Sequence, residues 1–197
     1  RQRQMCIRDR LGSTMRILGV DPGLTRCGVG VIDASSTRKV SLVHVETIRS
    51  GPDEELSARI LGVGSRIEEL IKAHKPQALA LERVFAQANL RSVMGVAQIS
   101  GVVLFLAAKY KLPLRMHTPS EVKAAVTGSG RAQKAQIGSA VAKILGLTEV
   151  PQPADSADAL AIAITSAWKG LPLQVESDSL TPAQKAWAQA ERASKRK

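Results

Sequence analysis

The sequence predicts an α/β domain built on a five-stranded mixed sheet flanked by helices. Strand-length apolar runs rich in β-branched residues recur along the chain, and longer segments with helical periodicity separate the later runs. A length of 197 residues is enough for one such domain with additional tails. We expect the domain over residues 15–170, a foreign or mis-called leader over residues 1–14, and a flexible basic tail over residues 171–197.

The first two strands are predicted to form a hairpin around Asp21. An apolar run ends at this carboxylate, a Pro-Gly turn follows, and a second apolar run covers residues 29–32. Asp21 is therefore expected at the end of a rigid strand. Nearby glycines would let another group approach it closely: Gly23, Gly28 and Gly30. The alternative is that Asp21 only forms the turn, because Asp is favoured at the first position of type I turns.

The remaining elements follow from the spacing of apolar residues. A third strand at residues 39–48 would complete an antiparallel meander. Helices are expected at residues 53–75, 90–110, 120–127, 137–145 and 155–169, and strands at residues 77–82 and 112–117. The crossover helix before residues 77–82 allows that strand to pair in parallel with an earlier one.

Three of these helices carry more specific expectations. In the helix over residues 53–75, three acidic residues should occupy the first turn, and one stripe should be buried: Leu56, Ile60, Leu61, Ile67, Leu70 and Ile71. Its two glycines, Gly62 and Gly64, should mark close packing. The helix over residues 90–110 is apolar on most of its circumference, which predicts burial by the core and by a partner subunit. The segment 118–121 predicts a capping box with proline at the first helical position.

Four carboxylates are predicted to gather at one edge of the sheet. Glu82 ends an apolar run just as Asp21 does, and Asp155 and Asp158 share one face at the start of the last helix. Four neighbouring carboxylates need cations to stay ionised, and hard divalent metals such as Mg²⁺ or Mn²⁺ prefer oxygen ligands. The alternative is that Asp155 is a helix N-cap and that Asp158 only complements the helix dipole in the first turn.

The charge of the chain predicts a polyanionic partner. The net charge is +11 and the sequence pI is about 10.2, with basic residues spread through the body of the chain. Lys123, Arg131 and Lys134 surround a glycine-rich turn and would contact phosphates, although a merely solvated surface is the competing interpretation. Two cysteines without a Cys-x-x-Cys pair and three scattered histidines argue against a zinc site or a disulfide framework.

The sequence also predicts where the protein works. No apolar stretch reaches the length of about eighteen residues that spans a bilayer, and residues 1–14 lack the apolar core of a signal peptide. We therefore expect a cytoplasmic protein without a membrane partner.

Three separated motifs together resemble the RuvC family of bacterial Holliday-junction resolvases. They are the run Gly19-Val20-Asp21-Pro22-Gly23, the segment Leu81-Glu82-Arg83-Val84-Phe85 followed by Asn89, Gln98 and Gly101, and the run Ala154-Asp155-Ser156-Ala157-Asp158-Ala159-Leu160-Ala161. The resemblance covers residues 15–170. It implies an RNase H-like fold and a homodimer that resolves four-way DNA junctions by two symmetric nicks during homologous recombination and DNA repair.

The resemblance also implies roles for individual residues. Asp21, Glu82, Asp155 and Asp158 match the family's catalytic, metal-binding acids, although some relatives carry histidine at the position of Asp155. Two Mg²⁺ ions per active site are implied, with Mn²⁺ as a substitute. DNA contacts are expected from Phe85, Asn89, Lys123, Arg131 and Lys134. Phe85 would make its contact through its aromatic ring. The implied protein partners are the branch-migration proteins RuvA and RuvB.

Two other functions compete with this interpretation. An ATP-binding protein of the actin and sugar-kinase type also begins with a Gly-x-Asp strand, but its two lobes need a longer chain. A junction-binding protein without catalysis is the second alternative, and the intact set of four acids argues against it.

Overall fold

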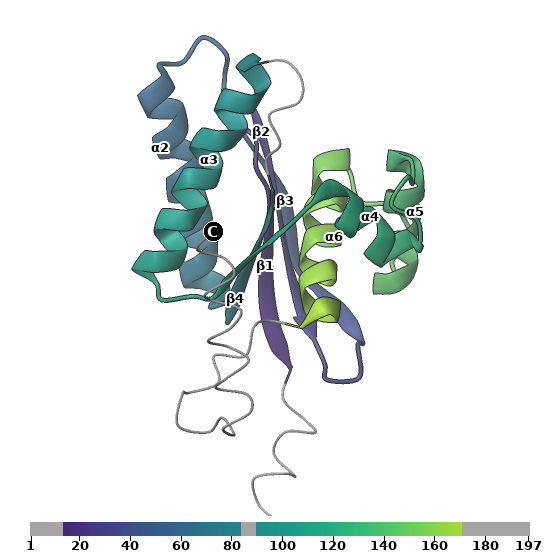
Figure 1. Cartoon of the computed structure of the whole chain (residues 1–197). Helices are drawn as coiled ribbons and strands as arrows, with labels where there is room; N and C mark the ends of the chain where they lie inside the picture. The colour runs from purple at the N-terminus through teal and green to yellow at the C-terminus, as the bar shows by residue number, and fades with distance from the viewer. Residues whose placement is uncertain (1–13, 84–89, 171–197) are drawn as a thin grey trace, which may run out of the picture.

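The computed structural model describes residues 14–83 and 90–170, and within them it forms a five-stranded sheet with helices on both faces (Figure 1). The strand order is β3-β2-β1-β4-β5. The strands are β1 (Met15–Asp21), β2 (Arg26–Ala34), β3 (Val40–Arg49), β4 (Ala78–Glu82) and β5 (Leu114–His117). The helices are α2 (Leu56–His74), α3 (Leu90–Lys109), α4 (Pro119–Thr127), α5 (Lys134–Leu145) and α6 (Ala154–Lys169).

The sheet is mixed, as the sequence predicts. Strands β1, β2 and β3 pair antiparallel, and β3 lies at the edge. Strand β4 pairs in parallel with β1, and β5 pairs in parallel with β4. The crossover through α2 brings β4 back beside β1, so the first and fourth strands end at the same edge of the sheet.

Helices α2 and α3 cover one face of the sheet; α3 begins at Leu90 as predicted, whereas α2 begins later than predicted. The structure starts α2 at Leu56, with Glu55 as its N-cap, so no acidic residue lies in the first turn. The carboxylate of Glu54 instead accepts a hydrogen bond from the backbone N–H of Gly51. This local bond stabilises a turn before the helix, in competition with an earlier helix start.

The buried stripe of α2 is narrower than predicted. Ile67, Leu70 and Ile71 are buried against the sheet, whereas the side chain of Leu61 is 69% exposed. Of the two glycines, only Gly64 reflects close packing: an added Cβ would lie 2.9 Å from Cγ1 of Val102 on α3, while nothing lies within 4 Å of one at Gly62. The expectation was therefore wrong for Leu61, for Leu56, which is 44% exposed, and for Gly62.

Helices α4, α5 and α6 cover the opposite face, where α6 lies directly on β1 and β2 (Figure 1). The predicted capping box starts α4: the Thr118 hydroxyl accepts from the N–H of Glu121, whose carboxylate accepts from the N–H of Thr118. The middle of α6, from Ala159 to Ser166, is buried. This tight packing fixes the start of α6 relative to the ends of β1 and β2.

Within the described ranges, no helix is both long enough and apolar enough to cross a membrane.

Candidate active site at the strand ends

Two carboxylates lie side by side where β1 and β4 end. Val20 pairs with Leu81 in the parallel ladder, so the next residues, Asp21 and Glu82, are neighbours on adjacent strands. Successive side chains of a strand alternate between faces. Val20 and Leu81 point into the core beneath α2 and α3, and the two acids therefore point to the face that α6 covers.

Glycines let α6 approach this edge. An added Cβ at Gly28 would lie 2.1 Å from the carbonyl oxygen of Asp155, and one at Gly19 would lie 2.5 Å from that of Ala159. Any side chain at these positions would push the helix away from the sheet. The sequence predicted a close approach to Asp21, and the approaching group is the first turn of α6.

The first residues of α6 complete the cluster. Asp21, Asp155 and Asp158 can each present one carboxylate oxygen such that all three oxygens lie within 4.8 Å of one another. Glu82 lies outside this group of three but is close enough that its charge raises the pKa of Asp21. The structure thus brings together the four acids expected from the sequence, three of them in a tight set with Glu82 beside it.

Burial and mutual repulsion weaken the acidity of the two strand-end acids. The pKa of Asp21 rises from 3.8 to about 8, first because the carboxyl is buried and then because Glu82, Asp158 and Asp155 repel a second negative charge. Burial also raises the pKa of Glu82, followed by the charge of Asp158. Without a cation, Asp21 therefore holds a proton at neutral pH.

Two cations border the acids. The Nζ atom of Lys134, at the start of α5, lies 3.2 Å from Oδ2 of Asp158. The Nε atom of Arg26, at the start of β2, lies 3.5 Å from Oδ2 of Asp155. Lys134 was predicted from the sequence, whereas Arg26 was not. Arg26 could have been predicted from its position in the sequence, because it directly follows the predicted turn after Asp21.

The capping alternative for Asp155 is wrong. The N-cap of α6 is Pro153, and Asp155 lies inside the helix, where its carboxylate pairs with Arg26. Asp158 lies beyond the first turn, so it is not a first-turn partner of the helix dipole either. Within residues 14–83 and 90–170, the carboxylate of Asp21 accepts no hydrogen bond from the following turn, which argues against a pure turn-forming role.

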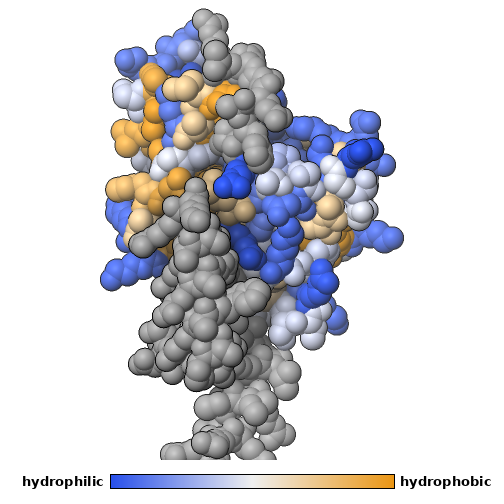
Figure 2. Space-filling view, viewed as in Figure 1, coloured by the Kyte–Doolittle hydropathy of each residue, from blue (hydrophilic) through white to orange (hydrophobic). Residues whose placement is uncertain are grey.

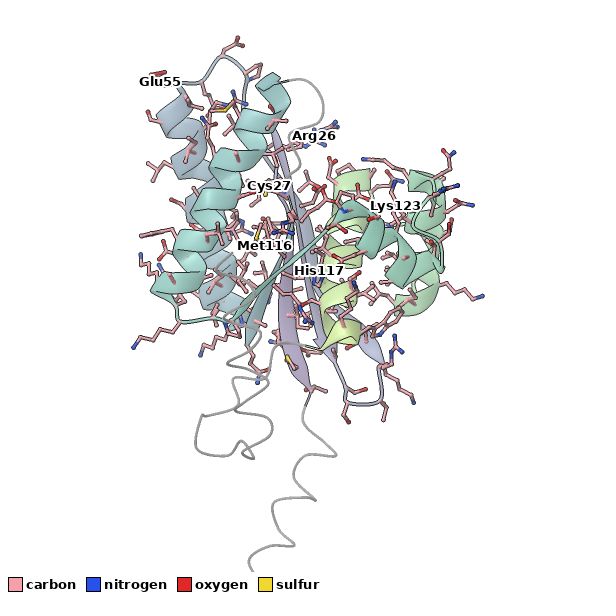
Figure 3. The ribbon with its side chains drawn as sticks, viewed as in Figure 1. Arg26, Cys27, Glu55, Met116, His117 and Lys123 are labelled. Carbon is pink, nitrogen blue, oxygen red and sulfur yellow. The ribbon has the colours of Figure 1, made fainter. Side chains whose placement is uncertain are left out.

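The expected DNA-contacting residues are only partly described. Lys123, on α4, is near enough for its charge to lower the pKa of Glu82 (Figure 3). Arg131 is exposed in the turn between α4 and α5, beside a cavity of about 590 Å³. Phe85 and Asn89 lie outside the described residues.

The donor atoms of the cluster suit a hard divalent metal. All four candidate ligands are carboxylates, which Mg²⁺ and Ca²⁺ prefer. The nearby thiol of Cys27 is buried, which raises its pKa to about 12, and its side chain packs into the core beneath α2 and α3. A thiolate ligand of the kind that softer metals prefer is therefore absent from the described part of this site.

The chain matches one protein family over most of its length. The family model described as crossover junction endodeoxyribonuclease RuvC matches residues 17–166. Curated proteins of that name are similar to the chain: the one from Leifsonia xyli subsp. xyli is 52% identical over 93% of this chain and 95% of its own length. The one from Clavibacter michiganensis subsp. michiganensis is 59% identical over 79% of this chain and 77% of its own length.

Solved structures agree with these sequence matches. Thermus thermophilus RuvC in complex with a Holliday junction substrate matches with a TM-score of 0.75 and 35% identity, over 79% of this chain and 94% of that one. The yeast mitochondrial Holliday junction resolvase Ydc2 shares the fold, with a TM-score of 0.57 and 13% identity over 84% of this chain and 86% of its own. These matches confirm the RNase H-like fold with its five-stranded mixed sheet.

Proposed function

The chain belongs to the RuvC family of crossover junction endodeoxyribonucleases, and on this basis we propose that it resolves four-way DNA junctions by two symmetric, metal-dependent nicks in recombination and repair. The observation that supports this function most directly is the convergence of Asp21, Asp155 and Asp158. A basic protein that gathers acids at one point is suited to bind a phosphate backbone and to hold metal beside it.

The four acids would hold two Mg²⁺ ions, or Mn²⁺ in their place. Asp21 is central because the charges of all three other acids act on its carboxylate, and a cation bound there would relieve that repulsion. Bound divalent ions supply a water nucleophile at neutral pH and stabilise the departing 3′-oxygen, which leaves a 5′-phosphate and a 3′-hydroxyl.

The residues of the chain prepare the site for those ions. Asp21 and Glu82 are held rigidly by the β1–β4 ladder, and Asp155 and Asp158 by the contact of α6 with the glycines of β1 and β2. A ligand set fixed in this way does not need to reorganise when the charge changes during the reaction. Asp21 must release its proton for metal to bind, which couples metal affinity to pH.

Basic residues beside the acids, together with Phe85 and Asn89, would position the DNA. Lys123 and Lys134 both act on the acids from the α4–α5 side, and Arg131 is exposed in the turn between these helices. We infer that these three bind backbone phosphates, and that Phe85 and Asn89 contact the bases and backbone near the crossover. The side of the molecule formed by α4 and α5 is largely hydrophilic (Figure 2).

A homodimer would present two such sites to the two-fold symmetric junction. The outward face of α3 exposes Met94, Leu104 and Phe105, a patch of apolar side chains that is visible on the front of the molecule (Figure 2). We infer that a second copy of the chain covers this patch, because a two-fold dimer matches two equivalent cleavage positions. The side chain of Phe105 is 64% exposed in the single chain.

The remaining expectations follow from the family. We propose that residues 15–170 form the nuclease unit, that the protein is cytoplasmic, and that it works with the RuvA and RuvB branch-migration proteins. The family match falls within this range.

A nicking assay on a synthetic four-way junction tests the proposed function. We expect paired nicks at symmetric positions in the presence of Mg²⁺, none in EDTA, and no cleavage of a linear duplex of the same sequence. Binding without nicking at any Mg²⁺ or Mn²⁺ concentration would favour a junction-binding protein that lacks catalysis. Binding of ATP with no affinity for the junction would favour the nucleotide-binding alternative.

A further inference from the structure

Arg26 touches the acidic cluster although no DNA-binding or catalytic role has been assigned to it. Its Nε atom lies 3.5 Å from Oδ2 of Asp155. The side chain of Arg26 is 57% exposed, whereas that of Asp155 is only 18% exposed. The guanidinium therefore reaches from solvent to the rim of the site, and it lies at the end of the sheet beside the start of α6 (Figure 3).

The position of Arg26 in the sheet places it near the acids. Arg26 is the first residue of β2, and its register partner on the edge strand is Arg49. Gly28, two residues further along β2, pairs with Asp21 and faces the backbone of Asp155. Arg26 is thus on the same face of the sheet as the acids, one strand away from Asp21.

The contact between Arg26 and Asp155 is weak enough to be exchanged. A distance of 3.5 Å is longer than a charge-assisted hydrogen bond, and ion pairs with a solvent-exposed partner stabilise a protein only weakly. The closest contact is made by the Nε atom, and no hydrogen bond joins the two side chains within the described residues, so the guanidinium keeps N–H donors for a second acceptor.

A metal ion on Asp155 would change the surroundings of Arg26. The metal ion would neutralise the Asp155 carboxylate that pairs with the guanidinium, and the ion and the guanidinium would then repel each other. The next acceptor within reach of an exposed arginine at a DNA-binding rim is a phosphate, which matches the geometry of a guanidinium.

We propose that Arg26 is an exchangeable counter-ion: it neutralises Asp155 in the metal-free protein, releases it when metal binds, and then contacts a backbone phosphate of the bound DNA. This assignment rests on the proposed function. It makes Arg26 a positioning residue for Asp155 and a phosphate contact that exists only in the metal-loaded complex. Metal binding therefore increases the number of phosphate contacts by one.

The test measures junction affinity against salt concentration for three proteins: wild type, Arg26→Gln and Arg49→Gln. Arg49→Gln is the matched control, because it removes the same charge from the neighbouring strand, and Arg49 makes no ion pair with the acids among the described residues. Each protein is measured in EDTA and in Ca²⁺, which takes the same oxygen ligands as Mg²⁺ with longer bonds. Gel analysis confirms that the junction stays uncut.

The proposal predicts a metal-dependent effect. In Ca²⁺, the slope of log affinity against log salt should be smaller by about 0.9 for Arg26→Gln than for wild type, the loss of one phosphate contact. In EDTA the two slopes should agree. Arg49→Gln should differ from wild type by the same amount in both conditions. Without DNA, the Ca²⁺ midpoint of Arg26→Gln should be about two- to fivefold lower, because the competing cation is gone.

A slope difference of equal size in EDTA and Ca²⁺, or none in either, would overturn the proposal. Thermal unfolding of Arg26→Gln should match wild type, and Arg26→Lys, which keeps the charge, should restore the Ca²⁺-dependent slope. Nicking by the wild-type protein distinguishes a failure of this proposal from a failure of the proposed function. If wild type fails to nick the junction in Mg²⁺, the proposed function fails; if it nicks while the slopes contradict the prediction, only the role of Arg26 fails.

Discussion

Replacing Asp21 by Asn should stabilise the metal-free protein, and the gain should grow with pH. The pKa of Asp21 is raised from 3.8 to about 8 by burial and then by Glu82, Asp158 and Asp155. A carboxyl with a raised pKa in the folded state opposes folding wherever the unfolded chain has already released the proton. Asn keeps a similar shape without a proton to lose, so it removes this effect.

The size of the effect follows from the pKa shift. The stability that protonated Asp21 contributes is fully present below about pH 4 and is lost as the pH rises towards 8. Within this window the free energy of unfolding of wild type falls by about 1.4 kcal/mol per pH unit relative to a protein without this carboxyl. Over the whole window the loss is on the order of 5 kcal/mol. The free energy of unfolding of Asp21→Asn relative to wild type should therefore increase by about 1.4 kcal/mol per pH unit between pH 5 and pH 7.

Urea unfolding of both proteins in EDTA at pH 5, 6, 7 and 8 measures this difference. Other titrating groups, such as His74 and His117 with their lowered pKa values, affect both proteins alike and cancel. Saturating Mg²⁺ should remove most of the pH dependence of wild type, because the bound cation replaces the proton. A difference between the two proteins that is constant from pH 5 to pH 8, or a destabilised Asp21→Asn protein, would refute the reasoning.

Three further predictions test the packing, the DNA contacts and the dimer. Gly28→Ala should destabilise the protein by about 1–3 kcal/mol in urea unfolding and weaken metal binding, because the new Cβ would lie 2.1 Å from the carbonyl oxygen of Asp155. Gly62→Ala is the control: nothing lies within 4 Å of its new Cβ, so it should stabilise the helix by up to about 1 kcal/mol. Lys123→Ala and Lys134→Ala should each reduce the salt slope of junction affinity by about 0.9; unchanged slopes in both variants would show that neither lysine contacts a phosphate. Wild type is expected to sediment as a dimer, and Phe105→Glu as a folded monomer, since this exposed ring lies in the proposed interface. An unchanged mass would place the interface elsewhere.

The strand-end acids could be predicted from sequence because the signal is local. An apolar run that stops at a carboxylate indicates a strand with an acid at its end, and this holds for both Asp21 and Glu82. The sequence also predicted a close approach at Gly28 and Gly30, where an added Cβ would meet α6, whereas one at Gly23 would meet Arg26. What the glycines could not reveal was which element makes this approach.

The predictions from sequence were wrong or incomplete where the structure depends on side-chain contacts that hydrophobic periodicity does not reveal. The start of α2 was misplaced because the Glu54 carboxylate bonds to Gly51 and stabilises a turn. Leu61 fits the helical stripe but is exposed, because α3 and the sheet cover only part of that arc. Arg26 was missed because its partner, Asp155, is distant in the sequence and is brought close only by the packing of α6 on β2.

The central claim is that the four acids hold metal for strand cleavage, and nicking by Asp21→Asn tests it most directly. The unfolding experiment above establishes whether this variant is folded, so a loss of activity can be assigned to the site. We expect it to bind the four-way junction in EDTA as tightly as wild type, because the metal-free Asp21 carboxyl already holds a proton at neutral pH and the substitution removes no charge there. It should lose Mg²⁺-dependent nicking by orders of magnitude. Substantial Mg²⁺-dependent nicking by the folded Asp21→Asn protein would contradict the account.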